Sequence, residues 1–341
     1  MITMDIFNND AFSAIQMTAA VDKLGYKPSF LSGFPGLYIP RPVRTTNVFI
    51  EERDASPALI QTSDRGTAPK EKGADKRRVR SFQTDRIAIG STIEAAEVQN
   101  IRAFGIETEL KTVQGEVSRR QFLMRQDMEL TKEYHLLNLI QGRFADADGS
   151  VIYDWADEFG QDQMVDVTVD WTKATATAQY LRQLVNPQRR QMLKNLKGLG
   201  GPDVQVHALC SAEFYDSLTT CNEVKSTFIN WNAAQELRND VGQAYGAFRY
   251  AGIWWHDYRG TDDNGMGIAS GEARLFPVGA NIFQMAYAPA ERFEFVNTLG
   301  QENYSWMVYD RDRDSWVRPE LATYPLPVCV MPSALQKFKN A

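Results

Sequence analysis

Residues 107–141, which read ETELKTVQGEVSRRQFLMRQDMELTKEYHLLNLIQ, decide the fold that we expect for this chain. The stretch has no proline and is built mainly from residues with high helix propensity. Its apolar residues recur at helical spacing in two sets, namely Leu110, Val113, Val117, Met124 and Met128, and then Leu123, Leu130, Tyr134, Leu137 and Ile140. About 30 helical residues would span about 45 Å, too long for the inside of a small domain. We therefore predict a spine helix that crosses a flat molecule and ends near Gly142.

Upstream of this helix, residues 46–90 have the pattern of two strands around a long polar tip. Thr46, Val48 and Ile50 alternate along the first strand. Between residues 65 and 86 there are eight basic residues against three acidic ones. The polar tip between the two strands, residues 63–76, is long. A connection of that length without its own secondary structure is usually functional or disordered. We predict a projecting β-hairpin with a basic tip.

Residues 1–45 are predicted to form an arm. An amphipathic helix is expected over residues 11–24, and the prolines between Pro28 and Pro42 then predict extended backbone. Such an arm buries little of itself, so it would lie on its own body or on a neighbouring copy. The first residues lack the regions of a signal peptide, and no uncharged run is long enough to span a membrane. The chain is therefore expected to be soluble and intracellular where it is made.

Downstream of the spine helix, residues 144–172 hold eight acidic residues and no basic one. Asp148 and Gly149 predict a hairpin turn inside this acidic segment. A helix is expected over residues 174–196, and the glycines and proline of residues 198–202 are the best domain boundary. Residues 203–290 then read as short mixed elements, and 291–341 as strands that return to the first half. The expected fold is a discontinuous α+β body with an inserted module and two projecting arms.

The composition is that of an ordinary globular protein, with 43% hydrophobic and 23% charged residues among 341. There are 37 basic and 43 acidic residues, and a net charge of −6 disfavours a protein that coats DNA or RNA. The three cysteines are an odd number and widely spaced, which predicts free thiols in a reducing compartment.

No catalytic template is complete in this sequence. The three histidines lie in different segments and are isolated from one another, at His135, His207 and His256. His207 and Cys210, taken with Cys221, lack the close second pair that a zinc site needs. The glycines of residues 265–271 do not have the spacing of a dinucleotide-binding loop. We expect no catalytic residue, no metal and no cofactor, and hence a protein that is not an enzyme.

Charge is unusually segregated along the chain, with a basic hairpin tip about 90 residues before the acidic segment. The two regions could be independent solvated faces, or they could meet within one chain. If the hairpin projects, its natural counterpart is the acidic segment of an identical neighbour, and such a contact repeats around a ring. The residues that we predict to form this contact between subunits are Arg77, Arg78, Arg80, Asp154, Asp157 and Glu158.

Short stretches along nearly all of the chain occur in an order and spacing that match a known family. They are Phe12, residues 17–20 (MTAA), 45–51 (TTNVFIE), 130–133 (LTKE), Gly142, 148–153 (DGSVIY), Ala288, Pro289 and 296–301 (VNTLGQ). Together with the arm, the basic hairpin, the spine helix and the inserted module, they resemble the major capsid proteins of tailed bacteriophages. More narrowly, the chain looks like the lambda-like family called phage major capsid protein E.

The resemblance implies the Hong Kong 97-type phage capsid fold. In that fold, residues 1–45 would be the N-terminal arm and 46–100 the extended β-hairpin loop. Residues 101–200, with the spine helix, and the return strands of 291–341 would form the peripheral domain. Residues 201–290 would form the axial domain.

The resemblance also implies a structural function. The chain would assemble with itself into the hexamers and pentamers of an icosahedral shell, in the host cytoplasm, and would enclose double-stranded DNA without binding it specifically. A scaffolding protein and a portal are implied partners, a decoration protein often accompanies such shells, and no membrane is involved. Some relatives of this fold join a lysine to an asparagine. Lys70, Lys72 and Lys76 lie where the donor would be, but no partner motif is visible, so no crosslink is expected.

Two other functions stay open at this point. A tail-tube subunit would form stacked rings or tubes in place of closed shells, and the long spine helix argues against it. A soluble hydrolase with a site in residues 201–290 would form a stable small oligomer and a pocket with perturbed acids.

Overall fold

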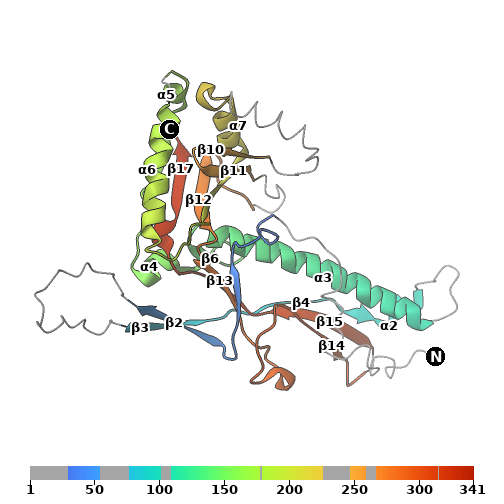
Figure 1. The fold of residues 1–341 in the computed structure, drawn as a ribbon. Helices are drawn as coiled ribbons and strands as arrows, with labels where there is room; N and C mark the ends of the chain where they lie inside the picture. Colours follow the sequence, from blue (N-terminus) through green and yellow to red (C-terminus); the bar gives the residue numbers. More distant parts are fainter. Residues whose placement is uncertain are drawn as a thin grey trace, which may run out of the picture.

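The computed structural model describes residues 30–53, 77–100, 109–176, 179–225, 246–258, 266–313 and 315–341 (Figure 1). The helix predicted over residues 11–24, the tip of the basic hairpin and the three candidate crosslinking lysines lie outside these residues. The helices are α2 (Ala95–Asn100), α3 (Glu109–Leu139), α4 (Trp155–Phe159), α5 (Trp171–Ala176), α6 (Tyr180–Asn195) and α7 (Ala212–Thr220), with the short 3-10 turns η3 (Phe293–Phe295) and η4 (Pro332–Ala334). None of the described helices is both long and apolar enough to cross a membrane.

The strands of the described residues fall into five sheets. Their bounds are β1 (Ile39–Pro42), β2 (Asn47–Arg53), β3 (Arg77–Gln83), β4 (Ile87–Gly90), β5 (Ile93–Glu94), β6 (Arg143–Ala145), β7 (Val151–Asp154), β8 (Val167–Val169), β9 (Gln205–Cys210), β10 (Ala247–Tyr250), β11 (Ile253–Asp257), β12 (Glu272–Val278), β13 (Phe283–Tyr287), β14 (Tyr304–Tyr309), β15 (Trp316–Thr323), β16 (Pro325–Cys329) and β17 (Gln336–Asn340). The mixture of helices and sheets confirms the expected α+β class.

The predicted spine helix is confirmed as α3, which has 31 residues and so spans about 46 Å. Figure 1 shows it running from beneath the largest sheet to the far side of the molecule, next to α2. Met124 and Met128 pack with Leu321 of β15, and the C-terminal turn joins the main core. Gly142 adopts φ +80° and donates its N–H to the Leu139 carbonyl at 2.9 Å, which ends the helix where the sequence predicted.

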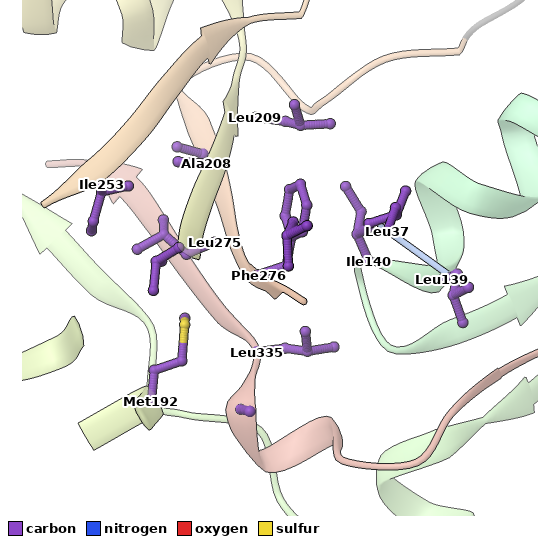
Figure 2. Packing of buried hydrophobic residues seen from close by; sticks show 14 of the residues in the cluster. Leu37, Leu139, Ile140, Met192, Ala208, Leu209, Ile253, Leu275, Phe276 and Leu335 are labelled. Carbon is purple, nitrogen blue, oxygen red and sulfur yellow. The ribbon is translucent and has the colours of Figure 1, made fainter. Parts of the chain in front are cut away.

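The largest sheet has six strands in the order β10-β11-β9-β12-β17-β8. Ala208 and Leu275 on one face turn towards Met192 of α6, whereas Phe276 on the other face turns towards Leu37 and the end of α3 (Figure 2). The Ser211 hydroxyl accepts the N–H of Phe214 and so caps the start of α7. Strands β8 and β17 come from outside residues 201–290. The domain boundaries implied by the resemblance therefore stay a prediction.

A three-stranded sheet, in the order β1-β13-β16, lies against the spine helix. On β13, Met285 and Tyr287 face α3 and line a small cavity with Met128 and Lys132 of that helix. Gln284 and Ala286 alternate to the opposite face. One face of this sheet is thus covered by α3, and its other face is turned away from the helix.

Both predicted hairpins are present. Strands β2 and β3 pair antiparallel from Asn47↔Gln83 to Arg53↔Arg77, and β6 and β7 pair around the turn at Gly149, which adopts φ +87°. The single helix predicted over residues 174–196 is wrong in one respect, since the structure has two helices there, α5 and α6. Gln179 adopts φ +68° just before α6, a left-handed conformation that a continuous helix does not allow.

Candidate functional site

The hairpin arm of β2 and β3 is seated on the acidic segment of its own chain. The buried ring of Phe82 on β3 makes edge-to-face contacts with Tyr153, Trp155 and Phe159, at centroid distances of 5.4, 5.2 and 5.9 Å. The backbone N–H of Gln83 donates to the Tyr153 hydroxyl at 3.3 Å. These contacts hold the base of the arm on β7 and α4, so the arm projects in a defined direction (Figure 1).

The structure brings one of the predicted arginines next to the acidic segment within the same chain. The guanidinium of Arg80 lies over the Phe159 ring at 5.6 Å. Arg77 forms an ion pair with Glu51 of β2 at 3.5 Å, and Arg78 is exposed. Surface pairs of this kind contribute little stability, so Arg77 and Arg78 remain available to other carboxylates.

The three predicted acidic residues belong to the start of α4. Asp154 caps this helix by accepting the N–H of Ala156 at 2.9 Å, and Asp157 and Glu158 lie in its first turn. Asp157 is exposed, and Glu158 is partly exposed. The contact of the arginines with the same helix of a second copy stays a prediction.

The outward face of the arm carries apolar side chains that the sequence reasoning missed. Phe49 of β2 and Val79 of β3 are 65% and 64% exposed, and they lie on the face opposite Val48 and Phe82. Val48, Phe49 and Ile50 are consecutive apolar residues, a pattern typical of a strand buried on both faces. That signal could have identified the second face as a contact surface.

A buried carboxylate fastens the start of the described chain to the spine helix. Glu133 of α3 accepts the backbone N–H groups of Leu31 and Ser32, both at 2.8 Å, and the Ser32 hydroxyl at 2.7 Å. The Tyr258 hydroxyl donates to the same carboxylate at 3.3 Å. The sequence reasoning missed this anchor, although an acidic residue beside the apolar positions Leu130 and Tyr134 was a signal for it.

Two of the three histidines are neighbours, so the expectation that all three are isolated is wrong. β9 and β11 are adjacent and parallel, which brings His207 Nδ1 within 2.9 Å of His256 Nε2. The rings of Phe30 and Phe34 cover the pair. Burial lowers the pKa of His207 to about 3, helped by His256, and burial lowers the pKa of His256 to about 4. Within the described residues, no group of three or more His, Cys, Asp or Glu side chains could hold a metal ion.

This histidine pair predicts that the unassembled chain loses stability in mild acid. An unfolded histidine has a pKa near 6.5, so between about pH 6.5 and pH 4 the unfolded chain binds protons that the folded chain does not. The free energy of unfolding therefore falls as the pH falls, by at most about 1.4 kcal/mol per pH unit for each histidine. Urea denaturation at pH 7, 6 and 5 measures this slope.

Replacing one histidine tests the origin of that slope. The substitution His207→Phe should make the slope shallower between pH 6 and pH 5, by about 1 kcal/mol per pH unit. Trp254→Phe is the control, because Trp254 stacks on His207 and its replacement leaves both histidines in place. An unchanged slope in His207→Phe would contradict the prediction.

A comparison of the whole chain with protein families identifies it. The family model described as phage major capsid protein E matches residues 13–340. The chain belongs to the phage major capsid protein E family. Two curated relatives are major capsid proteins. That of Salmonella phage Felix O1 (isolate Felix O1-VT1) is 23% identical and covers 95% of each chain. That of Pseudomonas phage KPP10 is 26% identical and covers 87% of this chain and 89% of its own.

Solved structures show the same fold. A structure described as the capsid protein of a prophage of E. coli CFT073 has a TM-score of 0.57 at 12% identity, covering 96% of this chain and 99% of its own. A subunit of the mature capsid of bacteriophage PhiM1 has a TM-score of 0.52 at 10% identity, covering 93% and 88%. The family member described here is therefore a structural protein of a phage capsid shell, located in the virion, and not an enzyme.

Proposed function

We propose that this capsid protein assembles with itself into the hexamers and pentamers of an icosahedral shell, as a Hong Kong 97-type subunit that encloses the double-stranded DNA of a tailed phage. The observation that carries the proposal is the projecting arm of β2 and β3. In the proposed division, residues 46–100 are the extended loop and 201–290 the core of the axial domain. A scaffolding protein and a portal would take part in assembly in the host cytoplasm.

Physical chemistry supports a neighbouring copy as the partner of the arm. A two-stranded hairpin alone is at best marginally stable in water, and this one has no third strand among the described residues. Its outward face exposes Phe49 and Val79, which a partner would remove from water. Arg77 and Arg78 lie at the distal end of the described arm, whereas Asp157 stands exposed on α4 near its base. Complementary charges at two different places favour a head-to-tail contact that repeats around a ring.

Reversing the charge of the arm should block assembly. The double substitution Arg77→Glu and Arg78→Glu removes two positive charges and adds two negative ones opposite an acidic helix, so repulsion replaces attraction. We expect a folded chain, with an unchanged circular dichroism spectrum and melting temperature, that forms no shells in negative-stain electron microscopy. The parent chain, expressed alone and with its scaffolding protein, should form shells made of ring-like capsomers.

A matched variant distinguishes the effect of the charge on the arm from the effect of a changed net charge. Arg311→Glu with Arg313→Glu changes the net charge equally, in the exposed turn between β14 and β15. This control should still form shells. The proposed contact is wrong if the arm variant forms normal shells, or if both variants fail alike.

A further inference from the structure

A groove of about 1,260 Å³ lies on the face of the three-stranded sheet that is turned away from the spine helix. Gln284 and Ala286 of β13 form part of its floor, and the base of the hairpin arm forms one wall. We call it the basic groove, and its lining includes Arg41, Val43, Arg44, Lys197, Leu199 and Val330. Its lining combines apolar side chains such as Val43, Leu199 and Val330 with polar ones and with the three basic residues, so the chemistry that fits it is an apolar side chain flanked by carboxylates.

The cations of the basic groove are unpaired in the described part of the chain. Arg41, Arg44 and Lys197 are exposed, and none has a described carboxylate within ion-pair distance. Glu51 is the one acidic residue among the described residues of the lining, so three basic residues face a single carboxylate there. The rim therefore has an excess of positive charge in a chain whose net charge is −6.

A turn with the complementary chemistry projects from the same chain between β13 and β14 (Figure 1). We call residues 291–298 the Phe293 knob; Leu299, which follows it, lines the basic groove. Phe293 is fully exposed and Val296 is 58% exposed, while the exposed carboxylates of Glu291 and Glu294 flank Phe293. Among the described residues, the carboxylate of Glu291 has a single ion-pair contact, a long one of 3.9 Å with Arg86. The knob thus combines an apolar tip with carboxylates, as the basic groove requires.

The knob is anchored on its own domain, while Phe293 at its tip is fully exposed among the described residues. The buried ring of Phe295 anchors it, and the Thr298 hydroxyl donates to the Phe295 carbonyl at 2.8 Å. The guanidinium of Arg292 lies over the Trp306 ring at 4.8 Å, which ties the one basic side chain of the knob to its own domain. These contacts anchor the turn that carries the exposed Phe293 side chain. Such a side chain is pre-organised for a partner that buries it.

We propose that the Phe293 knob of one copy docks in the basic groove of a second copy, with Phe293 against the apolar lining and Glu294 near Arg44 and Lys197. The inference rests on the proposed self-assembly. Knob and groove are different surfaces of one chain, so the contact is head-to-tail and repeats. Gly300, just after the knob, donates its N–H to the Val43 carbonyl at 2.8 Å on the groove wall. This bond links the end of the knob to the groove wall within one chain.

A disulfide between two different copies tests the contact directly. One chain carries Phe293→Cys and a co-expressed chain carries Leu199→Cys. The native cysteines are free but buried, so they do not compete for disulfide formation; they are Cys210, Cys221 and Cys329. After oxidation, a non-reducing gel should show a crosslinked dimer at least tenfold more abundant than with Phe293→Cys and Thr172→Cys. Thr172 is exposed on α5, away from the basic groove. Equal or absent crosslinking would overturn the inference.

Charge reversal supplies a second, independent readout. Glu294→Lys should reduce the yield of shells at least tenfold, and adding Arg44→Glu to the same chain should restore it, because the attraction is re-formed with its sign exchanged. Normal shells in Glu294→Lys, or no rescue by Arg44→Glu, would overturn the inference. The failure of this inference can be told apart from the failure of the proposed function. Shells that form without the crosslink between positions 293 and 199 would disprove only the docking. A parent chain that never forms shells would disprove both the docking and the proposed self-assembly.

Discussion

Replacing Glu133 with alanine should destabilise the unassembled chain by about 3–5 kcal/mol, one of the two largest effects expected for a single substitution here. The substitution removes the acceptor of four hydrogen bonds, from the N–H groups of Leu31 and Ser32 and from the hydroxyls of Ser32 and Tyr258. Buried donors left without a partner cost about 1–3 kcal/mol each. The measurement is urea denaturation, together with limited proteolysis near residue 30, which should become much faster.

Two variants on the same helix make this result specific. Glu133→Gln keeps the shape and one acceptor oxygen, so it should lose less stability than Glu133→Ala. Asp127→Asn removes an exposed carboxylate of α3 and should change the free energy of unfolding by less than about 0.5 kcal/mol. The account of the anchor would be wrong if the free energy of unfolding of Glu133→Ala lay within about 1 kcal/mol of that of the parent chain.

Replacing Gly300 with alanine should cost about 3 kcal/mol or more, because there is no room for a side chain. An added Cβ would lie 1.9 Å from the Tyr287 carbonyl oxygen and 2.8 Å from the carbonyl carbon of Ala288. Both are backbone atoms, so the chain would have to move and would lose the Gly300–Val43 hydrogen bond. Thermal unfolding of the unassembled chain measures the loss.

The same substitution in the spine helix should have the opposite sign. Gly115 lies inside α3 with nothing within 4 Å of an added Cβ. Gly115→Ala should therefore raise the stability by about 0.5–1 kcal/mol, through the better helix propensity of alanine. A stability for Gly300→Ala equal to or above that of the parent would show that the close approach to Tyr287 is wrong.

The parts of the fold that could be predicted from the sequence are those coded by neighbouring residues. The spine helix, its end at Gly142, both hairpins and the cap at Ser211 follow from local propensity, spacing and turn chemistry. The break at Gln179 was not predictable in this way, because glutamine has no particular preference for a positive φ. The partners of β17 were not predictable either, since β12 and β8 lie far from it in the chain.

The candidate site divides in the same way. Charge segregation is visible in the sequence, and it led to the arginines of the hairpin arm and the acidic residues of α4. The contact of His207 with His256 depends on the parallel register of β9 and β11, which no local pattern sets. The Glu133 anchor and the basic groove likewise combine residues from distant segments. Such features need the tertiary structure, whereas exposed apolar residues such as Phe49 were already visible as a break in alternation.

The position of β17 has a consequence for synthesis on the ribosome. This strand lies between β12 and β8 in the six-stranded sheet, yet both of its neighbours are translated before it. Until residues 336–340 have emerged, one edge of β12 lacks its partner and β8 has no strand partner among the described residues, so the sheet cannot be completed. A nascent chain on a polysome can therefore complete its six-stranded sheet only after this strand has been made.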